Sequence, residues 1–299
     1  MAKSRFAFLE DRGVLSVSGA DARAFLQGIV TNDIDRVTPD NAVYAALLTP
    51  QGKYLFDFFI AAHGDDLLLD AEAARLPDLA RRLTMYRLRA KAEIADVSAG
   101  HRVAAVFGDD AADDLALPSQ TGAARAIGDG VVFIDPRLTA AGARAILPSA
   151  DAEALLTEAG LTAASAEDYD SQRLRFALPD GSRDLVIDKA TMVESNFEEL
   201  NGIDFGKGCY VGQEVTARTK YRGLVRKRLW RVDVDGPLPA PGTPIMLNGK
   251  EAGTMQSGRD SVGIALLRLE RVDQAESSGE PLIAGEARLT PVKPDWAKF

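Results

Sequence analysis

The chain contains only one cysteine, Cys209, and only two histidines, His63 and His101. A single thiol excludes an intramolecular disulfide, and scarce cysteine is typical of reducing compartments. One cysteine and two distant histidines also cannot supply the four ligands of a structural zinc site. An iron–sulfur cluster held by four thiolates of this chain alone is excluded for the same reason. We therefore expect no permanently bound metal.

Long hydrophobic runs are missing as well. No stretch approaches the roughly 18 consecutive apolar residues that cross a bilayer. The opening residues, MAKSRFAFLEDRG, lack the apolar segment of a signal peptide. We therefore expect a protein of the bacterial cytoplasm, with no membrane partner.

Positive charge is in deficit, with 35 Lys and Arg against 44 Asp and Glu and a net charge of -9. Such a surface repels phosphates, so we expect no stable binding of nucleic acid. Residues 207–231 are the exception, because they contain eight basic residues and one acid. The eight are Lys207, Arg218, Lys220, Arg222, Arg226, Lys227, Arg228 and Arg231. They indicate either an anion-binding surface or a solvated face whose aliphatic stems cover apolar residues.

The length of 299 residues, with 46% hydrophobic and 26% charged residues, predicts a globular protein of two or three domains. Strand-like and helical segments mix without a regular alternation, which favours an α+β fold. Residues 42–49 and 53–62 are apolar runs separated by a PQGK turn, and they predict a hairpin. Ser165 is expected to start a helix over 166–178. Residues 190–202 predict another short helix, and an acidic loop is expected near 273–280.

Beyond Gly223 the pattern changes to short alternating runs divided by glycine and proline. The pair Asn248-Gly249 strongly favours a tight hairpin turn. These features predict a small all-β module, arranged as a barrel.

Cys209 lies in the glycine-rich stretch GKGCYVGQEVTARTKYRG, residues 206–223. The glycines permit a turn with positive φ, and Gln213 and Glu214 are expected to begin a helix that continues through Arg218. A thiol beside Lys207 and before a helix start favours its thiolate form, which is a nucleophile or a soft-metal ligand. A buried structural cysteine is the alternative interpretation.

The same turn offers backbone N–H groups to an anion, and the side chains that follow can bind carboxylates or phosphates. The candidate anion-binding side chains are Arg218, Lys220 and Arg222. The glycine spacing matches neither the phosphate-binding loop nor the dinucleotide fingerprint.

Asp57 is a carboxylate among aromatic residues in the run YLFDFF. If buried and unpaired, it would be suited to act as an acid or a base. A strand whose alternate face meets solvent explains it equally well. Tyr86 and Tyr169 are candidates to flank a flat heterocycle.

The segment ESNFEELNGIDFGKGCYVGQEVTARTKYRGLVRKRLW resembles the signature of the YgfZ-type folate-binding proteins. These form a branch of the aminomethyltransferase (glycine-cleavage T-protein) superfamily that includes a mitochondrial assembly factor for iron–sulfur proteins. The segments GADARAFLQGIVTNDI and LLTPQGKYLFDFF resemble the N-terminal part of the same family. The continuation TARTKYRGLVRKRL is most similar to the mitochondrial and alphaproteobacterial branch.

The resemblance implies interleaved α/β domains with antiparallel sheets, followed by a C-terminal β-barrel. Residues 1–221 would form the folate-binding region, with a second subdomain at about 98–165, and 222–299 would form the barrel. The implied ligand is tetrahydrofolate or a one-carbon derivative. The implied partners are [4Fe–4S] client proteins, tRNA-modifying enzymes among them, or assembly proteins.

The resemblance also implies site residues. Lys207, Cys209, Gln213 and Glu214 fall on the functional positions of the motif K-G-C-Y-x-G-Q-E. The remaining motif residues expected to contact folate are Gly208, Tyr210 and Gly212.

The chain departs from T-proteins at several positions. Phe56-Asp57 stands where T-proteins have paired acids, and Arg175 lies near the position of an acid that contacts the pterin. Arg12 and Tyr169 align with tryptophans thought to flank folate in enterobacterial relatives.

We therefore expect an accessory factor of iron–sulfur assembly rather than a true aminomethyltransferase. A folate-dependent aminomethyl or one-carbon transferase with Asp57 as base, and a module that docks an acidic partner, stay open.

Overall fold

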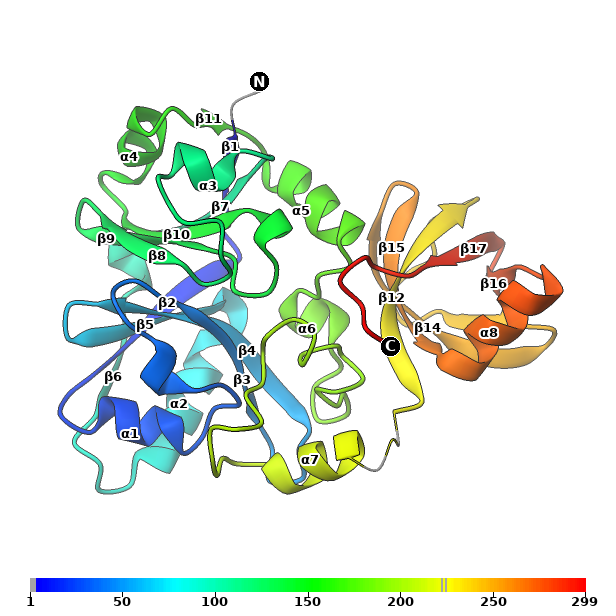
Figure 1. Cartoon of the computed structure of the whole chain (residues 1–299), viewed down its shortest axis with the longest axis horizontal. Helices are drawn as coiled ribbons and strands as arrows, with labels where there is room; N and C mark the ends of the chain where they lie inside the picture. The colour runs from blue at the N-terminus through cyan, green and yellow to red at the C-terminus, as the bar shows by residue number, and fades with distance from the viewer. Residues whose placement is uncertain (1–3, 222, 224) are drawn as a thin grey trace. The chain divides into compact units, whose positions relative to one another are not determined.

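The computed structural model describes residues 4–221, 223 and 225–299, which form two compact units (Figure 1). Unit 1 is built from the chain up to Leu48, Leu55–Tyr169 and Leu200–Gln213. Unit 2 is built from Thr49–Tyr54, Asp170–Glu199 and Glu214–Phe299. The chain therefore passes between the two units more than once.

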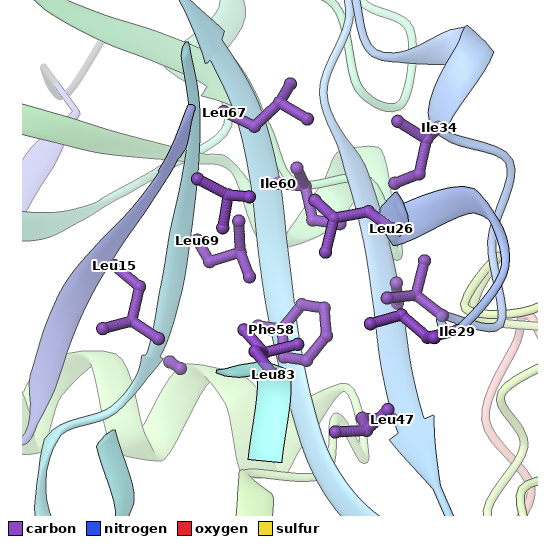
Figure 2. Packing of buried hydrophobic residues seen from close by; sticks show 14 of the residues in the cluster. Leu15, Leu26, Ile29, Ile34, Leu47, Phe58, Ile60, Leu67, Leu69 and Leu83 are labelled. Carbon is purple, nitrogen blue, oxygen red and sulfur yellow. The ribbon is translucent and has the colours of Figure 1, made fainter. Parts of the chain in front are cut away.

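The first sheet of unit 1 has five strands in the order β3-β4-β5-β2-β6. Its strands are β2 (Arg12–Ser18), β3 (Val43–Leu48), β4 (Tyr54–His63), β5 (Asp66–Glu72) and β6 (Glu93–Asp96). The helical segments of this part are α1 (Ala22–Gln27), η1 (Ile34–Arg36), η2 (Ala73–Arg75) and α2 (Leu76–Arg87). One face of the sheet packs with residues of α1, η1 and α2 into a hydrophobic core (Figure 2).

The sequence of α2 explains why this segment forms an amphipathic helix. Leu76, Leu79 and Leu83 recur at spacings of three and four, so they share one helical face, and all three are buried. Pro77 stands at the start of the helix, where its missing N–H costs no hydrogen bond. The helix therefore contributes a leucine stripe to the core of the first sheet.

The second sheet of unit 1 has six strands in the order β11-β1-β7-β10-β9-β8. Its strands are β1 (Arg5–Phe8), β7 (His101–Phe107), β8 (Ala124–Ile127), β9 (Gly130–Ile134), β10 (Ala143–Pro148) and β11 (Thr162–Ala163). All of its pairings are antiparallel except β1 with β11. Its helical segments are η3 (Ser98–Gly100), α3 (Ala111–Asp114), η4 (Thr139–Ala141) and α4 (Ala152–Glu158). A second core packs one face of this sheet with residues of α3 and α4.

The remaining faces of the two sheets meet inside unit 1. On β4, Phe58 and Ile60 point into the core beside α1 and α2, so Phe59 points the opposite way. The ring of Phe59 lies 6.3 Å from that of Phe133 on β9 of the other sheet. Strand β4 is therefore buried on both faces, which explains its almost continuous apolar sequence.

Unit 2 contains a closed barrel of six strands in the order β12-β15-β14-β13-β16-β17. The strands are β12 (Lys227–Asp235), β13 (Pro244–Leu247), β14 (Lys250–Arg259), β15 (Val262–Arg268), β16 (Leu282–Ala284) and β17 (Ala287–Val292). The remaining helices are α5 (Ala166–Arg175), α6 (Gly181–Asp184), α7 (Gln213–Tyr221) and α8 (Leu269–Ser278). Asn248 and Gly249 join β13 to β14 with positive φ of 49° and 73°, as the predicted tight turn requires.

The predicted α+β class, the antiparallel sheets and the C-terminal barrel are confirmed. The predicted hairpin of 42–49 and 53–62 is confirmed, because β3 pairs with β4. The predicted helix start at Ser165 is also confirmed, because the Ser165 hydroxyl accepts a hydrogen bond from the Asp168 N–H. The predicted domain boundaries at about 98, 165 and 221 stay predictions. In the described part of the chain, no helix has the length and apolar character needed to cross a membrane.

Two local predictions are wrong. Residues 190–202 form successive turns rather than a helix, because Asn196 and Asn201 adopt positive φ of 61° and 54°. The expected loop near 273–280 is largely occupied by α8, whose Val272 and Ala275 are buried against the barrel core. The hydrophobic free energy gained by burying these two residues favours the helix, although its other face is acidic and rich in serine.

The leucine stripe of α2 generates a stability prediction. Leu83→Ala removes a side chain with no exposed surface and should lower the free energy of unfolding by about 2–5 kcal/mol. Met85→Ala, two residues further along the same helix, is the matched control, because Met85 is 69% exposed. Denaturant unfolding of both variants checks this, and equal losses for the two would contradict the packing described for α2.

Candidate functional site

A cluster of buried charges lies between the two sheets of unit 1, with Asp70 of β5 at its centre. Its Oδ1 accepts a hydrogen bond from Arg12 Nε at 2.6 Å. Its Oδ2 accepts from Arg144 Nε at 2.8 Å and from Arg144 Nη2 at 2.6 Å. Arg12 belongs to β2 of the first sheet, whereas Arg144 belongs to β10 of the second. The buried carboxylate therefore links the two sheets, and losing either arginine would break that link and leave one carboxylate oxygen without its hydrogen bonds from that side chain.

An aromatic ring, Phe59 of β4, lies against the guanidinium groups of this cluster. The Cζ atoms of Arg144, Arg137 and Arg12 lie 4.1, 4.9 and 5.9 Å from its centroid. The ring of Tyr44 on β3 lies 5.0 Å away. Cations over an aromatic face attract its quadrupole most strongly where water is excluded, so the ring and the arginines stabilise one another.

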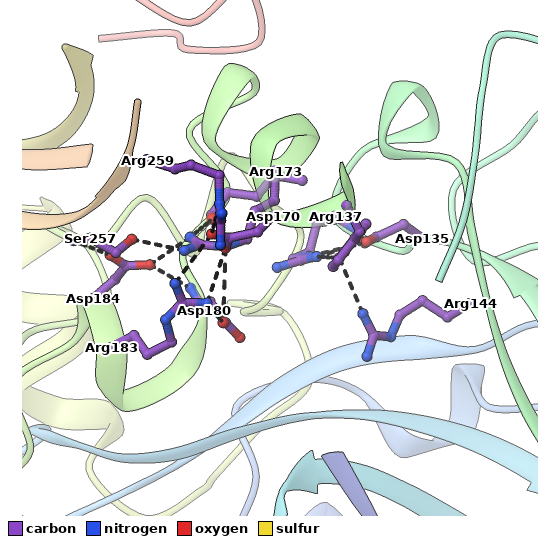
Figure 3. A network of polar contacts seen from close by, with 12 residues as sticks. Asp135, Arg137, Arg144, Asp170, Arg173, Asp180, Arg183, Asp184, Ser257 and Arg259 are labelled. Atoms are coloured by element: carbon purple, nitrogen blue, oxygen red, sulfur yellow. Dashed lines mark hydrogen bonds and ion pairs between the residues drawn. The ribbon is translucent and has the colours of Figure 1, made fainter. Parts of the chain in front are cut away.

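Arg137 follows β9 and is paired with Asp135 through two hydrogen bonds, Nε to Oδ1 at 3.1 Å and Nη2 to Oδ2 at 2.8 Å (Figure 3). Burial disfavours the charged guanidinium, but the charge and hydrogen bonds of Asp135, together with Tyr169 and Tyr44, outweigh it, so the pKa of Arg137 is raised well above its ordinary value. Arg137 and Arg144 also donate to the Tyr169 hydroxyl at 3.4 and 3.3 Å. The Tyr169 hydroxyl is therefore hydrogen-bonded to two guanidinium groups.

Asp57 lies on the same face of β4 as Phe59 and is buried. The Tyr44 hydroxyl donates to Asp57 Oδ2 at 2.7 Å. Burial, followed by the nearby charge of Asp57, raises the pKa of Tyr44 well above its ordinary value, so Tyr44 stays a donor. The interpretation of Asp57 as a residue on a solvent-facing side of its strand is wrong, because that face meets the second sheet. A buried carboxylate in this setting is suited to bind an N–H group or to take a proton.

The cysteine loop is a separate feature of unit 1. Cys209 is exposed, so the alternative of a buried structural cysteine is wrong. Gly208 and Gly212 adopt φ of 98° and 86°, which confirms the predicted positive-φ turn. Gln213 begins α7 as predicted, and its Oε1 accepts from the Tyr210 backbone N–H at 3.1 Å.

Lys207 anchors this loop to an earlier segment of the chain. Its Nζ donates to the backbone carbonyls of Val30 at 2.6 Å and Asn32 at 2.5 Å. Beside these bonds, Asn32 Nδ2 donates to the carbonyl of residue 201 at 2.7 Å, and the Thr31 hydroxyl to that of residue 202 at 2.6 Å. Burial lowers the pKa of Lys207 to about 8, although Asp33, Asp204 and Asp35 oppose the change. Lys207 therefore positions the loop that carries Cys209.

The remaining residues predicted to bind folate or an anion belong to unit 2 or lie outside the described residues. Arg175, Glu214 and Arg218 are exposed, and Arg222 is outside the described part of the chain. Members of the basic run are ion-paired, including Lys220 with Glu198 at 2.6 Å, Arg228 with Glu199 at 3.0 Å and Arg231 with Asp233 at 2.6 Å. Arg228 is buried, so part of the basic run serves the fold itself.

The structure thus groups the predicted residues of unit 1 into two places. Asp57 and Tyr169 belong to the buried cluster, whereas Lys207, Cys209 and their motif neighbours belong to the loop. Most of the buried cluster was not predicted: Tyr44, Phe59, Asp70, Asp135, Arg137 and Arg144. A usable signal was present for some of them, because a lone charge inside an apolar strand, as in LLLDA or ARAIL, indicates a buried partner elsewhere. Among the described residues, no group of three His, Cys, Asp or Glu side chains is arranged to hold a metal ion.

Comparison with known proteins agrees with this architecture. Residues 10–124 match the family described as GCVT N-terminal domain, and residues 226–299 match CAF17, C-terminal beta-barrel domain. The chain is 33% identical over 311 residues to iron-sulfur cluster assembly factor IBA57, mitochondrial, of Mus musculus, covering 96% of this chain and 84% of that protein. The chain belongs to the IBA57 family.

The human IBA57 protein is likewise 33% identical over 284 residues, covering 88% of this chain and 77% of its own length. Among solved structures, the glycine cleavage system aminomethyltransferase T from Bartonella henselae matches with a TM-score of 0.77 and 15% identity. That match covers 99% of this chain and 87% of the other. It establishes that the IBA57 family member described here has the T-protein-like fold.

The expectation of a bacterial cytoplasmic protein is contradicted. The IBA57 relatives from mouse, human and the fungi Mycosarcoma maydis and Pyricularia oryzae are all named as mitochondrial proteins.

The setting of Lys207 generates a pH prediction. Its side chain should lose its proton near pH 8, because burial disfavours the ammonium. The unfolded chain then binds more protons than the folded chain between about pH 8 and 10.5, so this residue makes the free energy of unfolding rise with pH across that interval. NMR titration of the lysine Cε and Nζ signals checks this, with Lys207→Arg to assign the resonance. A Lys207 signal that titrates only above pH 10 would contradict the burial argument.

Proposed function

We propose that this chain is an accessory factor for the assembly or repair of [4Fe–4S] proteins. In this proposal tetrahydrofolate, or a one-carbon derivative, binds at the buried cluster of unit 1, and the Cys209 thiol meets the iron–sulfur cluster or the protein that carries it. The observation that carries the proposal is an exposed sole thiol, on a loop with positive-φ glycines, in a chain related over almost its whole length to iron–sulfur cluster assembly factors.

The role of the thiol follows from how few ligands the chain can offer. One thiolate supplies one bond to iron, whereas a cluster usually takes four. Cys209 would therefore act as a transient ligand, with the other ligands supplied by a client or assembly protein. Its exposure supports this role, because an exposed thiol can reach a second protein.

The buried cluster has the chemistry that a folate head group requires. A pterin is flat and carries N–H donors, so a carboxylate such as Asp57 can accept from it while aromatic rings pack against its face. Tyr44, Phe59 and Tyr169 supply rings around the cluster. When bound, tetrahydrofolate would carry one-carbon units, and the residues of this chain would bind and orient it.

A folate-dependent one-carbon transferase is the second candidate, and the buried Tyr44–Asp57 hydrogen bond favours it. Asp57 would then act as the base that takes a proton from the bound amine or folate. This candidate requires turnover of an aminomethyl, methyl or formaldehyde-level donor with tetrahydrofolate, which Asp57→Asn should abolish. Absence of turnover with every donor removes the transferase and leaves the assembly role intact.

The thiol role predicts a defect in cells. When the chain replaces the resident family member, Cys209→Ala should lower the activity of [4Fe–4S] enzymes, because no other residue of this chain can supply a thiolate. Enzymes without a cluster serve as the internal reference, and immunoblotting confirms that the variant accumulates normally. If [4Fe–4S] enzymes keep full activity with Cys209→Ala, the thiol role is wrong.

The folate role predicts a distinct result in vitro. Calorimetric titration should show that the wild-type protein binds tetrahydrofolate and that Asp57→Asn weakens binding by roughly ten- to a hundredfold, as expected for a lost charged acceptor. The asparagine can still accept from Tyr44, so the fold is retained. Cys209→Ala is the matched control and should bind like the wild type. No binding by the wild type would remove folate from the proposal without affecting the thiol role.

A further inference from the structure

A cavity of about 350 Å³ lies in unit 2, and its floor is the outer face of the barrel. Trp230, Met255 and Leu267 point into the barrel core, so the residues next to them in the strands point outward. Those outward neighbours are Leu229, Leu266 and Thr254, which pair across three adjacent strands and line the cavity. The outer face of this part of the barrel is therefore covered rather than exposed to bulk solvent.

Residues 184–195 form the rest of the lining, and backbone hydrogen bonds fix them in place. The Tyr54 N–H donates to the Ala190 carbonyl at 2.9 Å, and the Asp188 N–H donates to the Tyr54 carbonyl at 3.0 Å. On the barrel side, Arg228 Nη1 donates to the Val193 carbonyl at 2.6 Å. These bonds hold the main chain beside the cavity in place.

Gln256 of β14 contributes an amide group to the lining. Gln256 is 7% exposed, and its Nε2 makes a long hydrogen bond of 3.3 Å to the Thr254 carbonyl. Within the described chain, no group donates to its Oε1. This oxygen is not among the enclosed polar atoms that lack a partner, so it is accessible and can accept from an N–H or O–H group of a ligand.

The cavity is lined by both positively and negatively charged side chains. Among described residues, neither Lys189 nor Lys227 forms an ion pair, whereas Glu194 accepts only from the Thr191 hydroxyl, at 2.9 Å. Asp184 adds no free charge, because its carboxylate accepts from Arg173 Nη1 and from the backbone N–H groups of residues 180 and 257, each at 2.9 Å (Figure 3). The cavity therefore presents two ammonium groups and one carboxylate.

We propose that this cavity binds a free α-amino acid with an apolar side chain. Lys189 and Lys227 would hold the carboxylate, and Glu194 with Gln256 Oε1 would accept from the ammonium group. The apolar wall, which includes Leu185, Val186, Leu229 and Leu266, would cover the side chain. The volume lies within the range of roughly 300–1,000 Å³ found for small-molecule sites. This site goes beyond the assembly function and does not depend on it.

Calorimetric titration of the full chain with L-leucine and L-phenylalanine tests the site. At least one of them should bind saturably. L-leucinamide, which lacks the carboxylate, and 4-methylpentanoate, which lacks the ammonium group, should each bind at least about tenfold more weakly than L-leucine, because each loses a charge-assisted hydrogen bond. Absence of saturable binding by both amino acids, or equal affinity for L-leucine and its two analogues, overturns the proposal.

Substitutions of residues that line the cavity test whether the amino acid binds there. Lys227→Met and Gln256→Leu should each weaken amino-acid binding by about tenfold or more. Lys250→Met is the matched control, since Lys250 is an exposed lysine of β14 outside the cavity, and it should bind like the wild type. Wild-type affinity in both cavity variants would overturn the assignment, and the analogue series on the wild type remains decisive if either variant fails to fold.

Discussion

The buried carboxylate of Asp70, shared by Arg12 and Arg144, is the interaction on which the arrangement of unit 1 depends. A carboxylate with no exposure is very unfavourable unless cations and hydrogen bonds compensate it. The two arginines come from different sheets, so compensation requires the sheets to meet at one register. Phe59, Tyr44 and Arg137 lie around that point, and the candidate ligand-binding residue Asp57 lies on the same face of its strand.

Unit 1 contains two candidate functional features, the buried cluster around Asp70 and the loop that exposes Cys209. The cluster around Asp70 is buried and paired, so its side chains are held in defined orientations, as the proposed folate site requires. The loop with Cys209 exposes its thiol, and Lys207 attaches that loop to the segment that follows α1. The proposed ligand site and the exposed thiol belong to the same unit, which suits the accessory role proposed above.

The sequence was informative where local rules decide the structure. The apolar runs predicted β3 beside β4, the Asn248-Gly249 pair predicted a turn, and the glycines around Cys209 predicted positive φ. The two positive-φ asparagines of 190–202 and the buried stripe of α8 were missed, because tertiary contacts decided them. The buried cluster was mostly missed for the same reason: Asp70 and Arg144 are 74 positions apart, and no local pattern states that they pair. The family resemblance supplied the fold, whereas the expected location is contradicted by relatives that are named as mitochondrial proteins.

The claim that the Asp70-centred cluster is the platform for the folate ligand has a direct test in hydrogen–deuterium exchange of the full chain with and without tetrahydrofolate. The account predicts slower exchange on ligand binding in β3, in β4 around residues 57–59, and at residues 135–137. Exchange in these segments that is unchanged by saturating tetrahydrofolate, with protection confined to other parts of the chain, would contradict the account.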